Sequence, residues 1–291
     1  MPDLVLHQIT EQAIAALIAR PVHAVQISGP AGSGKFSIAR QAAAGLLGVT
    51  VDSLAVYPYI KIVSPDETTA NRSISIESIR ELQRFLTLRV PGKQGGIARI
   101  IIIQDAHTMA AEAQNALLKT LEEPPADTVV ILTAQSKDIM LPTIQSRVRH
   151  VVALQPTADQ LSTHFIARQY GNADIARAIM LSGGLPGLTA ALLDGNTDHP
   201  LVTATVHARG ILQSKSYERL LLVDGLSKQK QLSVDVLYVM SQMARMSLLK
   251  ATDASSAQRW RRILRATYDA HEQLSRNTQA KLVLTNFMLV L

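Results

Sequence analysis

Seven residues near the start of the chain combine glycines and a lysine in a spacing that can bind phosphate. They read Gly-Pro-Ala-Gly-Ser-Gly-Lys from Gly29 to Lys35. Glycines allow backbone N–H groups to turn toward phosphate oxygens, and a lysine at the end of such a loop reaches the outer phosphates. With the two residues that follow, the candidate binding residues are Gly29, Pro30, Ala31, Gly32, Ser33, Gly34, Lys35, Phe36 and Ser37.

A phosphate-binding loop of this kind needs a strand before it and a helix after it. The apolar run from Val22 to Ile27 predicts the strand, and the stretch from Lys35 to Leu47 predicts the helix. The start of that helix adds partial positive charge to the site. The alternative is a glycine-rich turn between strand and helix that binds nothing.

The residue after the lysine departs from an ordinary ATPase loop. Ser or Thr normally stands there and places a hydroxyl on Mg²⁺, whereas this chain has Phe36. Ser37 follows, but one helical step turns the side chain by about 100°. We therefore expect the loop to bind a nucleotide while holding its metal ion poorly.

A second strand in such ATPases ends in acidic residues that serve the metal ion and the attacking water. Here the aliphatic run from Arg99 to Ile103 is followed by Gln104 and Asp105. The motif can be aligned in two ways. In the first, Gln104 stands where the metal-binding acid is expected and Asp105 where the catalytic acid is expected. In the second, Asp105 is the metal-binding acid and Ala106 stands where the catalytic base is expected. Asp105 could also be an ordinary strand-end carboxylate. His107 is a candidate ligand, although a lone histidine beside a loop is more often structural.

The composition excludes several classes of protein. The chain has 291 residues, of which 47 % are hydrophobic and 18 % charged, with a formal net charge of +6. It contains no cysteine, which excludes disulfides, thiolate metal sites and a cysteine nucleophile. No apolar run approaches the length of about 18 residues that spans a membrane. The sequence thus predicts a soluble cytoplasmic protein whose positive charge is compatible with a polyanionic partner.

Strand patterns alternate with helix patterns only in the first half of the chain. This alternation predicts a parallel α/β sheet up to Leu154. The expected strands are 22–27, 59–63, 99–103, 128–134 and 151–154, and the expected helices between them are 7–20, 35–47, 76–86 and 110–122, with Ser75 as the cap of the third helix. Residues 66–72 read as a polar loop.

After Pro156 the patterns are helical. Helices are expected at 158–169, 174–181 and 188–193, followed by a linker at 194–200. Everything from Leu201 to the end reads as helix.

Three segments resemble a known family. Asn115 to Pro125 (Asn-Ala-Leu-Leu-Lys-Thr-Leu-Glu-Glu-Pro-Pro) looks like the signature segment of bacterial clamp-loader AAA+ ATPases. Ser146-Arg147 resembles the family's Ser-Arg-Cys motif, with Val148 in place of the cysteine, and 277–291 looks like the last helix of its collar domain. The resemblance implies an AAA+ domain at 1–154, a helical lid at 155–198 and a helical collar for oligomerisation at 199–291.

The departures from the family pattern indicate which branch the chain resembles. Motor subunits keep Lys-Thr in the loop, Asp-Glu after the second strand and an arginine in the lid, whereas this chain has Phe36, Gln104 and Pro186. The combination resembles the delta-prime or stator branch of the DNA polymerase III clamp loader. Bacterial members usually carry a four-cysteine zinc module after the first helix; the corresponding stretch 48–58 is short and has no cysteine, so we expect no zinc.

The resemblance gives Arg147 a role as an arginine finger that reaches a neighbour's γ-phosphate, because a planar cation stabilises charge on the transferring group. From its position alone, a surface arginine at a loop end is the alternative. Of two basic groups, the first is a candidate for DNA backbone contact, and the second for a solvated face of the collar or part of a subunit interface. They are Arg80, Arg84, Arg89 and Lys93 in one group, and Arg259, Arg261, Arg262 and Arg265 around Trp260 in the other.

These observations predict a stator subunit that binds ATP or ADP weakly and hydrolyses little of it. Its expected partners are motor and delta-like clamp-loader subunits, primer–template DNA in the assembled complex and, indirectly, the sliding clamp. A self-contained AAA+ ATPase acting on DNA is the main alternative. A scaffold that has lost nucleotide binding is the other.

Overall fold

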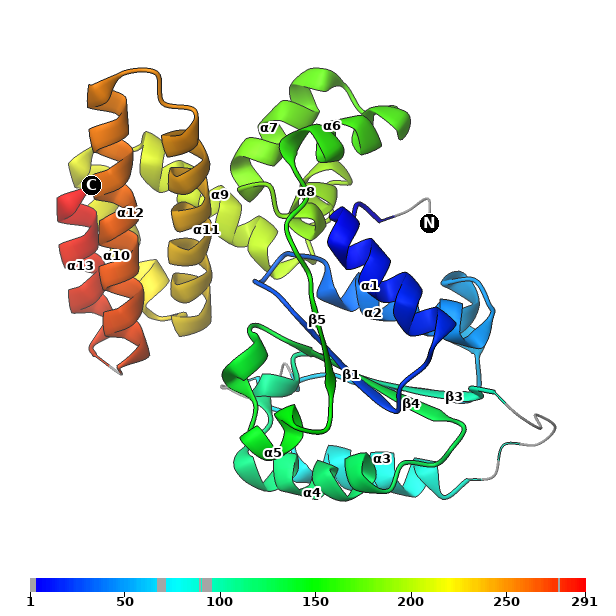
Figure 1. The fold of residues 1–291 in the computed structure, drawn as a ribbon. Coiled ribbons are helices and arrows are strands. Elements are labelled where there is room, and N and C mark those ends of the chain that lie inside the picture. Colours follow the sequence, from blue (N-terminus) through cyan, green and yellow to red (C-terminus); the bar gives the residue numbers. More distant parts are fainter. Residues whose placement is uncertain (1–3, 67–71, 89, 91–95, 277) are drawn as a thin grey trace. The chain divides into compact units, whose positions relative to one another are not determined.

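The structure, a computed structural model, describes residues 4–66, 72–88, 90, 96–276 and 278–291 (Figure 1). The chain divides into two compact units, Met1–Gln155 and Pro156–Leu291. The second unit contains both the expected lid and the expected collar, and the division between these two stays a prediction. Most of the predicted polar loop at 66–72 lies outside the described residues.

The first unit is built on a five-stranded parallel sheet in the order β2-β3-β4-β1-β5. The strands are β1 (Ala24–Ser28), β2 (Ile60–Val63), β3 (Arg99–Ile103), β4 (Thr128–Ala134) and β5 (Arg149–Val152). Every residue of β1, β3 and β4 is buried, as expected for strands covered on both faces. The predicted parallel α/β class is confirmed.

The last strand lies earlier than the sequence predicted. β5 pairs with β1 from Arg149 to Val152, not from Val151 to Leu154. The reason is that β1 ends at Ser28, opposite Val152. Beyond that point the N–H of Leu154 donates to Oγ1 of Thr10 at 3.1 Å, so the chain leaves the sheet and joins α1.

Helices cover both faces of the sheet (Figure 1). α1 and α2 pack on one face with Val25, Ile27 and other buried residues, and α3 and α4 pack on the opposite face with Ile101 and Ile103. The helices of this unit are α1 (Gln8–Ala19), α2 (Lys35–Leu47), α3 (Ile76–Leu86), α4 (Ala111–Glu122) and α5 (Pro142–Gln145), with short 3₁₀ helices at Asp52–Val56, Ala106–Thr108 and Lys137–Ile139.

The start of α3 was correctly predicted. Oγ of Ser75 accepts the backbone N–H of Ser78 at 3.1 Å and caps the helix. Ile79 and Leu82 are fully buried on its inner face, which agrees with the apolar spacing read from the sequence.

The described residues of the second unit form helices and no strand. The helices are α6 (Ala158–Ala167), α7 (Asn172–Ser182), α8 (Pro186–Leu193), α9 (Pro200–Gln213), α10 (Ser216–Ser227), α11 (Lys230–Leu249), α12 (Ala254–Ser275) and α13 (Ala280–Val290). Several boundaries differ from the prediction. α6 ends at Ala167 and α7 spans Asn172–Ser182, and Pro186 and Pro200 begin helices and do not precede them. Proline fits the first helical position, where no N–H is needed.

Two glycines of this unit have nearly the same backbone conformation but different surroundings. Gly183 has φ +66° and Gly195 has φ +64°. A Cβ built on Gly183 would lie 2.5 Å from Cβ of Gln242 on α11, whereas a Cβ on Gly195 would meet nothing within 4 Å. Gly183 is therefore required by close packing between α7 and α11 as well as by backbone conformation.

We expect Gly195→Ala to lower the free energy of unfolding by about 1 kcal/mol, the cost of the left-handed conformation. Gly183→Ala is expected to lower it by about 2–4 kcal/mol, because overpacking adds to the same backbone term. Urea unfolding followed by circular dichroism measures both. Equal losses would show that α11 yields to the added methyl group.

Candidate nucleotide site and surface arginine

The candidate phosphate loop follows the carboxyl end of β1. The N–H of Gly29 donates to the carbonyl of Ala134 at the end of β4, at 3.1 Å, and the N–H of Ala153 donates to the carbonyl of Ser28 at 2.7 Å. Because both neighbouring strands bond to this junction, the point where the loop leaves the sheet is fixed.

Three glycines shape the loop for different reasons. Gly32 and Gly34 have φ +75° and +79°, a conformation that costs little only for glycine. Gly29 lacks a positive φ, but a Cβ there would lie 3.0 Å from Oγ of Ser33 and 3.1 Å from the carbonyl oxygen of Ala153. The sequence-predicted glycines thus create one compact turn.

Lys35 begins α2 and is only 7 % exposed. Its Nζ donates to the carbonyl of Pro30 at 2.9 Å, inside its own loop. Burial lowers the pKa of Lys35, and the nearby charge of Asp105 opposes that shift. A buried ammonium beside a single carboxylate favours a further anion at this position.

The rest of the loop fits a phosphate group. Oγ of Ser33 is buried and has no partner among the described residues. α2 has no side-chain cap and no acidic residue in its first turn, so its first N–H groups are not taken by a carboxylate of the helix itself. These donors and the Lys35 ammonium form the kind of cradle that binds anions at helix starts.

The magnesium side of the site is weaker. Phe36 packs against the core between the sheet and α2, and its ring offers no oxygen. Ser37 is exposed. Neither Phe36 nor Ser37 thus offers a buried hydroxyl beside Lys35.

Gln104 and Asp105 directly follow β3 and form hydrogen bonds with different neighbours of that strand. Oε1 of Gln104 accepts the hydroxyl of Ser64, beyond β2, at 3.2 Å. The N–H of Asp105 donates to Oγ1 of Thr133 on β4 at 2.8 Å, and its charge acts on Lys35. The charge of Asp105 thus acts on the lysine of the loop, and the choice between the two alignments left open by the sequence stays a prediction. Thr133 was not predicted, although it is a polar residue in an apolar strand run.

His107 lies in the 3₁₀ helix after Asp105. Burial lowers its pKa, the charge of Asp105 opposes this, and the charge of Lys35 lowers the pKa further. Its Nδ1 is buried without a partner among the described residues. No group of three or more His, Cys, Asp or Glu side chains that could hold a metal ion occurs among the described residues, and the ligand role of His107 stays a prediction.

Arg147 follows α5 and is fixed on its own unit. Its Nη1 donates to the carbonyl of Thr143 at 2.9 Å and to Oγ of Ser146 at 3.1 Å. Its Nη2 lies 2.8 Å from Oε1 of Glu122, the last residue of α4. The side chain remains 36 % exposed. Glu122 lies 25 positions before Arg147 in the sequence, so their contact could not be found without the fold.

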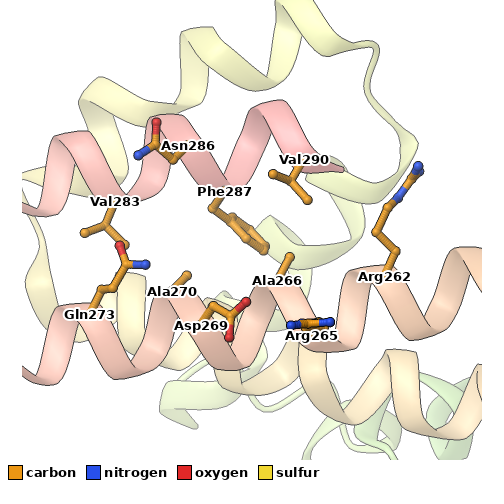
Figure 2. Close-up of a pocket in the computed structure, with 10 residues that line it drawn as sticks. All are labelled: Arg262, Arg265, Ala266, Asp269, Ala270, Gln273, Val283, Asn286, Phe287 and Val290. Atoms are coloured by element: carbon orange, nitrogen blue, oxygen red, sulfur yellow. The ribbon is translucent and has the colours of Figure 1, made fainter.

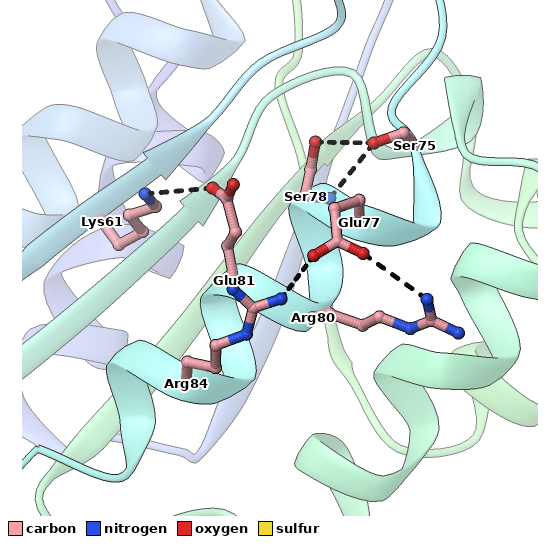
Figure 3. Close-up of polar contacts among 7 residues, drawn as sticks. All are labelled: Lys61, Ser75, Glu77, Ser78, Arg80, Glu81 and Arg84. Carbon is pink, nitrogen blue, oxygen red and sulfur yellow. Dashed lines mark hydrogen bonds and ion pairs between the residues drawn. The ribbon is translucent and has the colours of Figure 1, made fainter.

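The first basic group is compensated in part by a carboxylate of its own helix. Glu77 forms ion pairs with Arg80 at 3.5 Å and with Arg84, and Glu81 pairs with Lys61 at 3.9 Å (Figure 3). Arg89 and Lys93 lie outside the described residues. The described part of this group therefore presents paired charges, which weakens the hypothesis of a DNA-binding stripe.

The second basic group lies on α12. Its arginines are exposed, and Arg259 stacks over the ring of Trp260 with its guanidinium carbon 5.4 Å from the ring centroid. Arg262 and Arg265 stand at one end of a groove of about 330 Å³ between α12 and α13, near Phe287 (Figure 2). The groove contains none of the residues predicted to bind nucleotide.

The family follows from comparison with known proteins. The sequence model of the family described as DNA polymerase III, delta subunit, matches residues 8–157. The chain belongs to this family. The resemblance to clamp loaders read from the sequence is thereby confirmed.

Curated relatives of this clamp-loader family member include two delta' subunits of DNA polymerase III. That of Pseudomonas aeruginosa is 33 % identical over 194 residues, which cover 61 % of this chain and 57 % of the relative. That of Escherichia coli K12 is 30 % identical over 152 residues, covering 51 % and 43 %. The chain thus matches about half the length of these relatives.

A solved structure supports the fold. The gamma subunit-related protein of DNA polymerase III from Thermotoga maritima superimposes with a TM-score of 0.55 at 19 % identity, covering 97 % of this chain and 98 % of that one. This similarity shows the AAA+ fold. None of the described helices is long and apolar enough to cross a membrane.

We expect Lys35→Met to stabilise the nucleotide-free chain by about 0.5–1.5 kcal/mol near neutral pH, as substitutions that relieve a strained functional site commonly do. The gain should shrink as the pH rises toward 10. Burial lowers the pKa of Lys35 in the folded state, so between neutral pH and about pH 10 the unfolded chain binds more protons than the folded chain. Raising the pH therefore stabilises the wild-type protein but has no such effect on Lys35→Met.

Unfolding free energies of the two proteins near pH 7 and about pH 9.5 measure this effect. Lys119→Met, which removes an exposed lysine of α4, is the control and should change little. A loss of stability in Lys35→Met near pH 7 would mean that the hydrogen bond to Pro30 and the attraction of Asp105 outweigh the cost of burial.

Proposed function

We propose that this chain is a stator subunit of a clamp loader that supplies Arg147 to the nucleotide of a neighbouring motor subunit. The proposal rests on family membership and on relatives named as delta' and gamma/tau subunits of DNA polymerase III. In this role the chain assembles with motor and delta-like subunits and supports loading of the sliding clamp onto primer–template DNA during replication.

The observation that carries the proposal is the geometry of Arg147. Its guanidinium is held by contacts from Thr143, Ser146 and Glu122 and is still partly exposed. A cation that acts across an interface needs a fixed position and an accessible charge, and it needs no metal site in its own subunit. Arg147 meets both requirements.

The chain's own site is proposed to bind ATP or ADP without efficient turnover. Lys35, Ser33 and the first N–H groups of α2 would hold the phosphates, and the nucleotide would supply the negative charge that the buried ammonium favours. Phe36 cannot supply the hydroxyl ligand for Mg²⁺. Weak binding and negligible hydrolysis follow from that one difference.

A self-contained AAA+ ATPase acting on DNA is the second candidate. One observation favours it, because Asp105 keeps an acidic charge beside Lys35. Against it stand the absence of the hydroxyl at Phe36 and the engagement of Gln104 by Ser64. A scaffold without nucleotide binding is disfavoured by the intact cradle.

The test is reconstitution of the clamp loader with the motor subunits of the same organism. Arg147→Ala is expected to lower DNA-stimulated ATP turnover by roughly tenfold or more, because arginine fingers elsewhere contribute about 10³–10⁵, while assembly stays intact. Arg149→Ala removes an exposed arginine two residues away and should leave turnover unchanged. Equal ATP turnover by complexes containing the wild-type chain and the Arg147→Ala chain would refute the arginine-finger role.

A further inference from the structure

Glu122 occupies a position that helix stability does not explain. It is the last residue of α4, where the helix dipole disfavours a negative charge and favours residues such as Lys119 in the same turn. Its side chain is 49 % exposed, and an exposed ion pair adds little to stability. Because Glu122 does not stabilise its own helix, we look for a functional role of its side chain.

We propose that Glu122 is a positioning residue that orients Arg147 for a neighbour's nucleotide. This inference rests on the proposed function of Arg147. The ion pair joins two rigid anchors: Leu117 and Leu121 fix α4 in the core, and Ile144 and Val148 fix the chain on either side of Arg147. The contact at 2.8 Å therefore adds a restraint on Nη2 to a guanidinium whose Nη1 already donates to Thr143 and Ser146.

The free hydrogen-bond donors of Arg147 show whether Glu122 could orient the guanidinium for a target or would hold it away from one. A guanidinium has five N–H donors. Nη1 donates to Thr143 and Ser146, whereas Nη2 forms only an ion pair with Glu122. Nε and Nη2 donate no hydrogen bond to any of the described residues. Arg147 can therefore contact phosphoryl oxygens without leaving Glu122, and the ion pair presents the finger to its target.

The first experiment uses the isolated chain. NMR order parameters of the Arg147 Nε–Hε group are expected to fall in Glu122→Gln and to stay unchanged in Glu123→Gln. Glu123 is the matched control, because it is the next residue, carries the same charge, is exposed and has no ion pair among the described residues. Unchanged order of Arg147 in Glu122→Gln would overturn the inference.

The second experiment uses the reconstituted complex. Glu122→Gln is expected to lower kcat of DNA-stimulated ATP hydrolysis by about two- to fivefold, the range that exposed ion pairs support, with KM and assembly unchanged. In an Arg147→Ala background the same substitution should have no further effect, because Glu122 acts through Arg147.

The outcomes separate the two proposals. If Arg147→Ala leaves turnover intact, the proposed function of the finger fails. If Arg147→Ala lowers turnover while Glu122→Gln does not, only the positioning role fails. A rise in kcat in Glu122→Gln would show that the carboxylate restrains the finger, and an equal loss in the Arg147→Ala background would show that it acts elsewhere; either result overturns the inference.

Discussion

The site depends on one constraint, the pairing of β1 along both of its edges. β1 is buried over its whole length between β4 and β5, so every backbone group there must bond to a neighbouring strand. This fixes where Gly29 leaves the sheet and where α2 begins. Lys35 is buried as a consequence, and its ammonium lies where only an anion compensates fully for the lost water.

The same sheet positions the two charged residues Asp105 and Arg147. β3 carries Asp105 to the loop, where its charge acts on Lys35, and the segment between β4 and β5 carries Arg147 to the surface. Arg147 is anchored by its own unit, so its position does not require a bound nucleotide in the same chain. Binding and catalytic assistance can thus be separate properties of one fold.

The sequence predicted the parts of the fold that periodicity and end signals control. α2, β3 and β4 have the predicted bounds, because a glycine turn or an unbroken aliphatic run marks them. β5 was misplaced since its limits are set by its partner β1, and pairing partners are not visible in a local pattern. The contacts of Asp105 with Thr133 and of Arg147 with Glu122 join residues 28 and 25 positions apart in the sequence, and only the fold brings them together.

We propose that the loop binds nucleotide while its own subunit does not turn it over. Titration calorimetry of the isolated chain with ATP and ADP, combined with a phosphate-release assay on the same sample, tests it most directly. We expect stoichiometric binding that is weakened in Lys35→Ala, with no turnover above background. Steady ATP hydrolysis by the isolated chain, or no binding heat at millimolar nucleotide, would contradict it.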